Sequence, residues 1–371
     1  MRIAINTRFL LTSKMEGFGW YSYEVSKRLV EMHPEHEFYF FFDRPFDDKF
    51  VFAKNVTPIV LRPPARHPVL FYIWFEWSVK RALKKYKIDL FFSPDGYLSL
   101  GSSVPQVGVI HDLNFEHHPE DIPPFARRYL KHFFPKFARK ATKIITVSEY
   151  SKQDIVKTYA IPESKVHAIW NGVSDVFQPI SNEEKTLVKS KYSDNQEYFL
   201  FVGALHPRKN LIRLVQAFEL FKERTKASTK LVIVGTELWK NNTFKSSVSS
   251  SMQSEIIFTG HLSLEELAKV MAGAKLFTYV PYFEGFGIPL VEAMRCGTPI
   301  LAGNLTSLPE VAAEAAVYCN PFDVNEIAEK LILLYSDESM LNQLSKLGIE
   351  RSKLFSWDEC AKQVSDVLGL K

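Results

Sequence analysis

The chain has 371 residues, 46% of them hydrophobic, which suffices for a large core and for two domains. There are only three cysteines, Cys296, Cys319 and Cys360, an odd number without metal-ligand spacing, which fits a reducing compartment better than a disulfide framework. Neither a signal peptide nor an apolar run of roughly 18 residues is found, so we expect a cytoplasmic protein.

The net charge of +4 is unevenly distributed along the chain. Residues 1–170 carry 25 Lys and Arg against 18 Asp and Glu, whereas residues 171–371 carry 21 against 24. A basic first half indicates an anionic partner, and a membrane surface, a phosphorylated acceptor and a nucleic acid all fit that description.

In the first half of the chain, short apolar runs typical of buried strands alternate with helical patterns. A strand is expected at 2–6 and a helix at 20–32, and the turn-like segment that begins at Asn171 indicates a domain boundary. The first domain is therefore expected over residues 1–170. Its further strands are expected at 38–42, 88–93, 106–111, 143–148 and 166–170.

The second half repeats the alternation, which predicts two doubly wound α/β domains in tandem with ligands at the carboxyl ends of the strands. The second domain is expected over 171–356, with a C-terminal helix over about 357–371 as a candidate to pack back on the first domain. Strands are expected at 198–203, 230–235, 255–260, 275–280 and 298–303, and helices near 211–224, 263–272, 324–335, 339–351 and 357–368.

A glycine turn follows the first strand. Gly17 and Gly19 precede the first helix, where bare backbone could approach a phosphate, although a flexible loop would have the same composition. The turn is not the G-x-G-x-x-G of dinucleotide-binding proteins, and no P-loop motif is present. Nicotinamide chemistry and P-loop hydrolysis are therefore disfavoured.

Two cations follow the strand at 198–203. Arg208 and Lys209 lie between this strand and a helix, at the edge of the sheet where ligands bind, so together they could neutralise a pyrophosphate. A solvated basic turn is the alternative.

Two acids bracket a second glycine turn in the stretch EGFGIPLVEAM, residues 284–294. Glu284 precedes the turn and Glu292 lies one turn into the helix that follows it. A local explanation is available, because Pro289 suits a first helical position and Glu292 could complement the helix dipole. The spacing alone does not decide between ligand binding and this local role.

Taken together, these motifs resemble those of the GT-B glycosyltransferases of family four, which are retaining nucleotide-sugar transferases. The resemblance implies two facing Rossmann-like domains with a cleft between them, the first binding the acceptor and the second the donor. It is carried by residues 17–25, 109–120, 146–155, 171–173, 201–218, 284–300 and 307–316.

The resemblance also implies roles for residues. Glu292 would bind the donor ribose, Glu284 the sugar hydroxyls, and Arg208 with Lys209 the diphosphate. The implied donor-binding residues are Gly17, Gly19, Arg208, Lys209, Glu284, Gly285, Phe286, Gly287, Ile288 and Glu292, and the implied catalytic residues are His111, Arg208, Lys209 and Glu284.

The chemistry of this reaction explains the residue types. Negative charge develops on the departing diphosphate, and fixed cations and N–H dipoles stabilise it. Because the sequence contains no D-x-D, we expect no metal and no cofactor. The resemblance implies retention, with a phosphate oxygen accepting the acceptor's proton; an inverting enzyme would instead need His111 or Asp112 as general base.

We therefore expect a hexosyltransferase that moves mannose, glucose or N-acetylglucosamine to a glycan or lipid-linked glycan in polysaccharide or glycoconjugate biosynthesis. Aromatic and basic residues mix at 69–87 and 125–140, which suits either a peripheral membrane contact or an ordinary amphipathic core helix. We expect no nucleic-acid partner. Another GT-B enzyme, such as a nucleotide-sugar epimerase, and a non-catalytic membrane- or nucleic-acid-binding protein are the alternatives.

Overall fold

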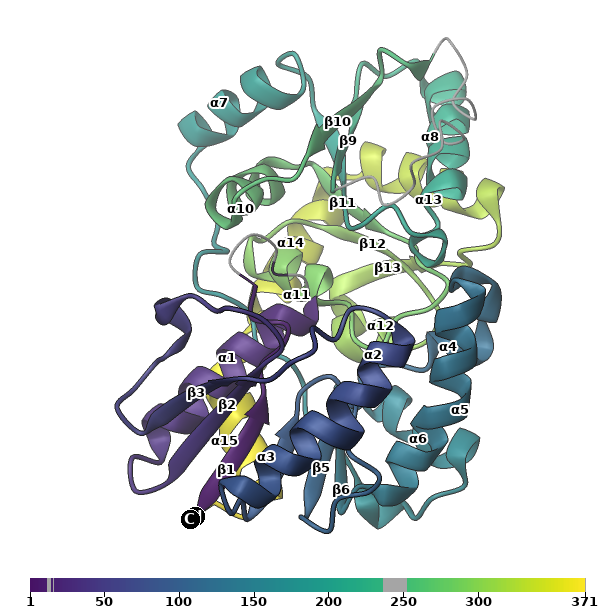
Figure 1. Cartoon of the computed structure of the whole chain (residues 1–371). Coiled ribbons are helices and arrows are strands. Elements are labelled where there is room, and N and C mark those ends of the chain that lie inside the picture. The colour runs from purple at the N-terminus through teal and green to yellow at the C-terminus, as the bar shows by residue number, and fades with distance from the viewer. Residues whose placement is uncertain (12–14, 16, 236–251, 371) are drawn as a thin grey trace. The chain divides into compact units, whose positions relative to one another are not determined.

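The computed structural model describes residues 1–11, 15, 17–235 and 252–370 (Figure 1). The chain divides into two compact units. Unit 1 comprises Met1–Gly172 and Ser356–Lys371, and unit 2 comprises Val173–Phe355. The chain thus leaves unit 1 near the expected boundary and returns to it at the C-terminal helix.

Unit 1 is built on a seven-stranded parallel sheet in the order β3-β2-β1-β4-β5-β6-β7. The order reverses between β1 and β4, and in such sheets ligands bind at the carboxyl ends of the strands beside the reversal. The strands are β1 (Arg2–Asn6), β2 (Glu37–Phe42), β3 (Val56–Val60), β4 (Leu90–Ser93), β5 (Gln106–Val109), β6 (Lys143–Thr146) and β7 (Val166–Ala168).

Helices cover the sheet of unit 1, and α2 continues through a π-helical segment, Trp74–Val79, into α3. No helix in the described part of the chain is both long and apolar enough to cross a membrane. The helices are α1 (Gly17–Met32), α2 (Pro68–Ile73), α3 (Lys80–Lys85), α4 (Asn114–His117), α5 (Pro124–Lys140), α6 (Glu149–Tyr159) and α15 (Trp357–Leu368).

The C-terminal helix α15 packs against α1 (Figure 1). Its buried face includes Trp357 and Val364, and the Trp357 ring contacts Tyr21 edge-on at 6.2 Å. Arg28 Nε donates to Asp358 at 2.6 Å across the same contact. This amphipathic pattern explains why the last helix joins unit 1 although it follows unit 2 in sequence.

Unit 2 has a six-stranded parallel sheet in the order β10-β9-β8-β11-β12-β13, which reverses between β8 and β11. The prediction of two doubly wound α/β units is confirmed. The strands are β8 (Tyr198–Val202), β9 (Lys230–Val234), β10 (Ile256–Gly260), β11 (Leu276–Tyr279), β12 (Ile300–Gly303) and β13 (Ala316–Cys319); the helices are α7 (Asn182–Tyr192), α8 (Leu211–Thr225), α10 (Leu264–Gly273), α11 (Ile288–Arg295), α12 (Leu308–Ala312), α13 (Val324–Ser336) and α14 (Glu338–Ser352).

Candidate active site

The basic turn after β8 is held in place by its neighbours. A short 3-10 turn, Pro207–Lys209, carries both cations, and the backbone N–H of Arg208 donates to Nδ1 of His206 at 3.3 Å. Asn210 ends the turn in the left-handed conformation, with φ 60°. Its side-chain amide donates to the carbonyls of Val280 at 2.9 Å and Pro321 at 2.6 Å. The turn is therefore fixed to the segments that follow β11 and β13.

Arg208, Lys209 and Glu284 form one ionic cluster, as their shared sheet edge led us to expect. Lys209 donates to a carboxylate oxygen of Glu284 and to the Tyr279 hydroxyl, the latter at 2.6 Å. Arg208 Nη1 lies 3.6 Å from the other Glu284 oxygen. Two cations therefore face one carboxylate at the reversal of the unit 2 sheet.

Glu284 is ionised in this cluster. The residue is 6% exposed, and although burial by itself would raise the pKa of its carboxyl group, Arg208 and Lys209 hold that pKa below its usual value. Burial, reinforced by the Glu284 charge, raises the pKa of the Tyr279 hydroxyl well above its usual value. Tyr279 therefore remains neutral beside the ion pairs.

The helix α11 begins directly after the Glu284 loop. Gly287 precedes it with φ 89°, a left-handed conformation that glycine favours, and a Cβ there would lie 3.0 Å from Leu308. The Glu284 backbone is held by Thr306 and Ser307: its N–H donates to Thr306 Oγ1 at 3.3 Å and its carbonyl accepts from Ser307 Oγ at 3.0 Å. This geometry brings the start of α11 close to the ionic cluster.

The side chains of this loop point in different directions. Phe286 is 3% exposed and contacts Phe355 inside unit 2 at 5.8 Å between ring centroids, so only its backbone is available to a ligand. Gly285 and Ile288 flank it along the same turn. Their predicted contacts to the donor stay predictions.

Glu292 differs from Glu284. It lies one turn into α11, partly buried, and its carboxyl group accepts no hydrogen bond from the residues that the structure describes. Burial raises the pKa of its carboxyl group to about 8. A carboxyl group with unfilled hydrogen-bonding positions is suited to a hydroxyl-bearing ligand.

The other predicted residues belong to unit 1. Gly17 is the first residue of α1 and a Cβ there would meet no atom within 4 Å, whereas a Cβ at Gly19 would lie 2.9 Å from the Phe9 carbonyl. Gly19 therefore allows the start of α1 to pack closely against the backbone at Phe9. Nothing in the geometry of unit 1 alone tests a phosphate contact by either glycine.

His111 follows β5 and packs against the first turns of α1, with ring centroids 4.7 Å from Phe18 and 4.9 Å from Tyr21. Its Nε2 donates to the Pro94 carbonyl at 2.8 Å, and burial lowers its pKa. The imidazole is therefore neutral at pH 7, and its Nδ1 carries the lone pair.

Sequence reasoning missed a buried polar network beside the strand reversal in unit 1. Arg8 Nε donates to Asp95 at 2.6 Å, and Asn6 donates to the same carboxylate at 2.9 Å. The Arg8 guanidinium also lies 4.3 Å from the ring centre of Tyr97. The detectable signal was position, because Asn6 ends β1, Arg8 follows it and Asp95 follows β4, all at the ligand edge of the sheet.

Two family models together match most of the chain. The model described as "Glycosyltransferase Family 4" matches residues 15–176, and "Glycosyl transferases group 1" matches residues 182–351. The chain belongs to the GT-B glycosyltransferases of family four.

Relatives and solved structures agree with this family. The glycosyltransferase is 29% identical to O-antigen chain mannosyltransferase B of Escherichia coli, with 96% of each chain covered. It is 26% identical to O-antigen chain mannosyltransferase RfbU of Salmonella typhimurium, over 74% of this chain and 72% of that protein.

Among solved structures, WaaG, a glycosyltransferase involved in lipopolysaccharide biosynthesis, has a TM-score of 0.77 at 16% identity, with 100% of both chains covered. Anabaena Alr3699/HepE, solved with UDP and glucose, has a TM-score of 0.78 at 16% identity and covers 100% of this chain and 99% of its own. These structural likenesses support the fold.

Proposed function

We propose that this glycosyltransferase moves mannose from a nucleotide-diphosphate sugar to a glycan acceptor in polysaccharide biosynthesis, with retention of configuration and without a metal. The observation that carries the proposal is the cluster of Arg208, Lys209 and Glu284 beside the start of α11. The choice of mannose is supported by the two O-antigen mannosyltransferases among its relatives.

In this proposal Arg208 and Lys209 bind the donor diphosphate. Breaking the anomeric bond leaves negative charge on the diphosphate, and the two cations stabilise that charge as it develops. The N–H groups of Gly287 and Ile288, at the positive end of α11, add to the stabilisation. Glu284 keeps both cations in place while its remaining acceptor capacity meets sugar hydroxyls.

The same cluster supports the proposal that no metal is needed. A divalent ion in such a reaction neutralises phosphate charge and is usually held by carboxylates. Here Glu284, the buried carboxylate that contacts both cations, is already paired with them. The protein thus supplies the positive charge that a metal would otherwise bring.

Retention requires that the acceptor hydroxyl attack from the side that the diphosphate leaves, so that a phosphate oxygen accepts the proton. The alternative is inversion, for which a neutral imidazole such as that of His111 has a lone pair able to act as general base. The configuration of the product, read by proton NMR of the new anomeric centre, separates the two mechanisms.

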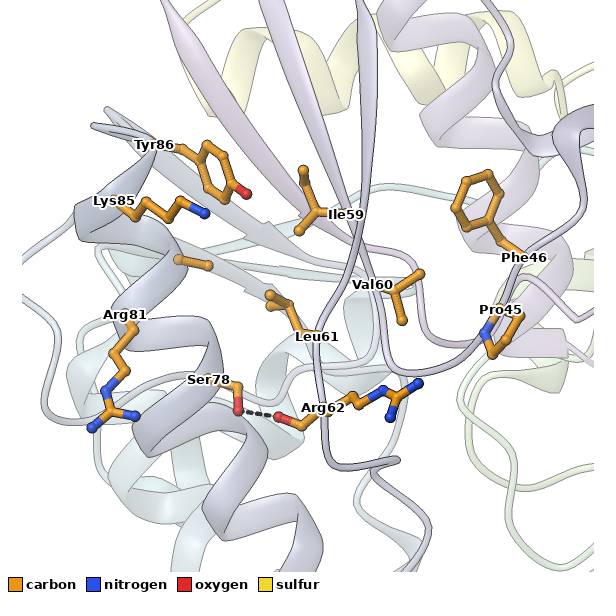
Figure 2. Close-up of a pocket in the computed structure, with 11 residues that line it drawn as sticks. Pro45, Phe46, Ile59, Val60, Leu61, Arg62, Ser78, Arg81, Lys85 and Tyr86 are labelled. Carbon is orange, nitrogen blue, oxygen red and sulfur yellow. Dashed lines mark hydrogen bonds between the residues drawn. The ribbon is translucent and has the colours of Figure 1, made fainter.

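For the acceptor we propose a lipid-linked glycan reached from an anionic membrane face. Unit 1 has an open cavity of about 760 Å³ between β3 and the helical segment of α3. Ile59, Leu61 and Tyr86 form an apolar wall, and Arg62, Arg81 and Lys85 lie around the rim (Figure 2). The neighbouring Trp77 is 56% exposed, as is typical of aromatic residues at a membrane interface.

The donor site is tested by adding GDP, UDP and ADP to the protein in EDTA and recording the melting temperature. We expect one nucleotide to raise Tm in the wild type and at least tenfold more of it to be needed after Arg208→Ala. Arg224→Ala, which removes an exposed arginine at the end of α8, is the matched control. If Arg208→Ala and the control respond to the nucleotides as the wild type does, the proposed diphosphate site is wrong.

A further inference from the structure

The turn between α1 and β2 gathers three metal-binding side chains. His33 and His36 are 12% and 11% exposed, and Glu35 between them is 50% exposed. Two imidazoles and one carboxylate are a ligand set that zinc uses readily, with a further position open to water. This cluster plays no part in the proposed transfer reaction.

The ligand atoms have the spacing of a tetrahedral site. Glu35 Oε1 lies 3.2 Å from His33 Nδ1 and 3.5 Å from His36 Nε2, and all three atoms lie within 4.8 Å of one another. A zinc ion with bonds of about 2.0–2.1 Å places tetrahedral ligands roughly 3.3 Å apart. Two of the three edges already match. The two imidazole rings are stacked, with centroids 5.5 Å apart and 8° between their planes, so zinc binding requires both rings to rotate out of this stack until their lone pairs converge.

One ligand atom lacks a hydrogen-bond partner. Nε2 of His36 is buried and makes no hydrogen bond within the described ranges of the chain, although buried polar atoms normally have such a partner. An ion between His36 and Glu35 would supply the missing interaction.

The outer contacts suit metal binding as well. Nε2 of His33 lies 2.7 Å from Ser365 Oγ on α15, so it can donate to that hydroxyl while Nδ1 binds the ion. The N-terminal ammonium lies 3.3 Å from Nδ1 of His36 and can donate to it. An ion at His36 Nε2 displaces the proton from that nitrogen, and Nδ1 then takes a proton from the ammonium, so that both imidazoles can offer a lone pair to the ion.

We propose that His33, Glu35 and His36 bind a structural divalent transition-metal ion, with zinc as the ion of choice. An ion binds His33 through a deprotonated Nδ1, so any proton on that nitrogen is released to solvent. Through the His33–Ser365 contact, the ion fastens the α1–β2 turn to α15. The site follows the last residue of the 16-residue helix α1, about 24 Å from its glycine turn, so it lies away from the ligand edge of the sheet.

The test uses full-length protein without a histidine tag, titrated with ZnCl₂ by calorimetry and with CoCl₂ by visible absorption. We expect one zinc per chain, intense cobalt bands of a tetrahedral site, and at least tenfold weaker zinc binding in His33→Gln, His36→Gln and Glu35→Gln. His261→Gln, at an exposed histidine of unit 2, should bind as the wild type does. Because Glu35 is half exposed, Glu35→Gln is expected to fold normally.

Ser365→Ala tests the outer contact. It should weaken zinc binding about 10- to 100-fold, since removing an outer partner of a metal-bound histidine has that effect. Zinc should raise Tm in the wild type but leave the rate of sugar transfer unchanged, which keeps this test separate from that of the donor site. Zinc binding that is absent, or that survives all three ligand substitutions, would overturn the proposal.

Discussion

At the scale of single residues, the two glutamates of the 284–294 stretch have opposite electrostatic environments. Glu284 is paired with two cations that lower its pKa, whereas burial raises the pKa of Glu292 to about 8. The sequence predicted that both acids serve the site but could not separate them, because the difference depends on which side chains surround each carboxyl group. Arg208 and Lys209 come from a strand end far away in sequence.

Replacing Glu292 by Gln should therefore stabilise the protein in alkaline solution. In the wild type the folded state holds the Glu292 proton more tightly than the unfolded chain does, so the free energy of unfolding falls as pH rises from the unfolded pKa of about 4.5 toward 8. The Glu292→Gln variant has no carboxyl group at this position, so its free energy of unfolding does not fall with pH in this way. We expect its Tm to exceed that of the wild type by about 2–4 °C at pH 8.5, the shift that roughly 1 kcal/mol produces in a domain of this size.

The Tm difference between the wild type and Glu292→Gln is measured by thermal melts at pH 5 and pH 8.5. The advantage of Glu292→Gln should shrink at pH 5, which is only slightly above the unfolded pKa of about 4.5, because little of the fall in the free energy of unfolding has occurred at that pH. Glu329→Gln, an exposed helical glutamate on α13, is the control and should show no such pH dependence. An equal Tm difference at both pH values would contradict the raised pKa.

The contacts of other site residues could not have been predicted from sequence. Tyr279 contacts Lys209, and Asn210 holds the basic turn to two strand ends. In the sequence, however, Tyr279 looks like any other strand residue and Asn210 like any other turn residue. Arg8 and Asp95 pair across 87 positions of the chain. Partners of this kind become visible only when the order of strands in the sheet is known.

At the scale of elements, the apolar runs located the central strands correctly because parallel strands are buried on both faces. The edge strands β3 and β13 were missed. β3 contains Pro58, which is tolerated at a sheet edge but weakens a strand prediction, and β13 has only four residues. Short edge strands depend on their neighbour for pairing more than on their own composition.

The docking of α15 on unit 1 gives a prediction at this scale. A Cβ at Gly172 would lie 2.1 Å from the backbone nitrogen of Trp357, so Gly172→Ala must displace the start of α15. We expect the substitution to lower the free energy of unfolding by about 1–3 kcal/mol, the usual cost of overpacking. Chemical denaturation, followed by tryptophan fluorescence, measures the change.

Gly17→Ala is the matched control for this substitution, because a Cβ at Gly17 meets nothing within 4 Å. It should leave the free energy of unfolding unchanged within about 0.5 kcal/mol. If Gly172→Ala were as stable as Gly17→Ala, the close contact between α15 and the end of unit 1's first segment would be wrong.

At the scale of the whole molecule, the family resemblance covered nearly the whole chain, and the family models match both halves. The uneven distribution of charge also concerns the whole chain. The basic first half supplies the cations at the rim of the unit 1 cavity. The sequence could not distinguish amphipathic core helices from membrane-facing ones, because that choice depends on which aromatic side chains the fold leaves exposed.

Membrane association is tested by flotation with vesicles containing anionic lipid. We expect the wild type to float with these vesicles at low salt, and Arg81→Ala/Lys85→Ala to float several-fold less, since each cation near an anionic surface contributes about 1 kcal/mol. Lys346→Ala/Lys353→Ala removes two exposed lysines of unit 2 and should float as the wild type does. Absence of wild-type flotation would remove the proposed peripheral association.

In the proposed reaction, groups of the protein alone, chiefly Arg208 and Lys209, stabilise the departing diphosphate. The most direct measurement is the rate of mannose transfer from the nucleotide sugar in excess EDTA, for the wild type and for Arg208→Ala. We expect an undiminished wild-type rate and a loss of about 100-fold or more in the variant, as when a group that stabilises developing negative charge is removed. A wild-type rate that depends on added magnesium or manganese, or an Arg208→Ala rate equal to the wild type's, would contradict the claim.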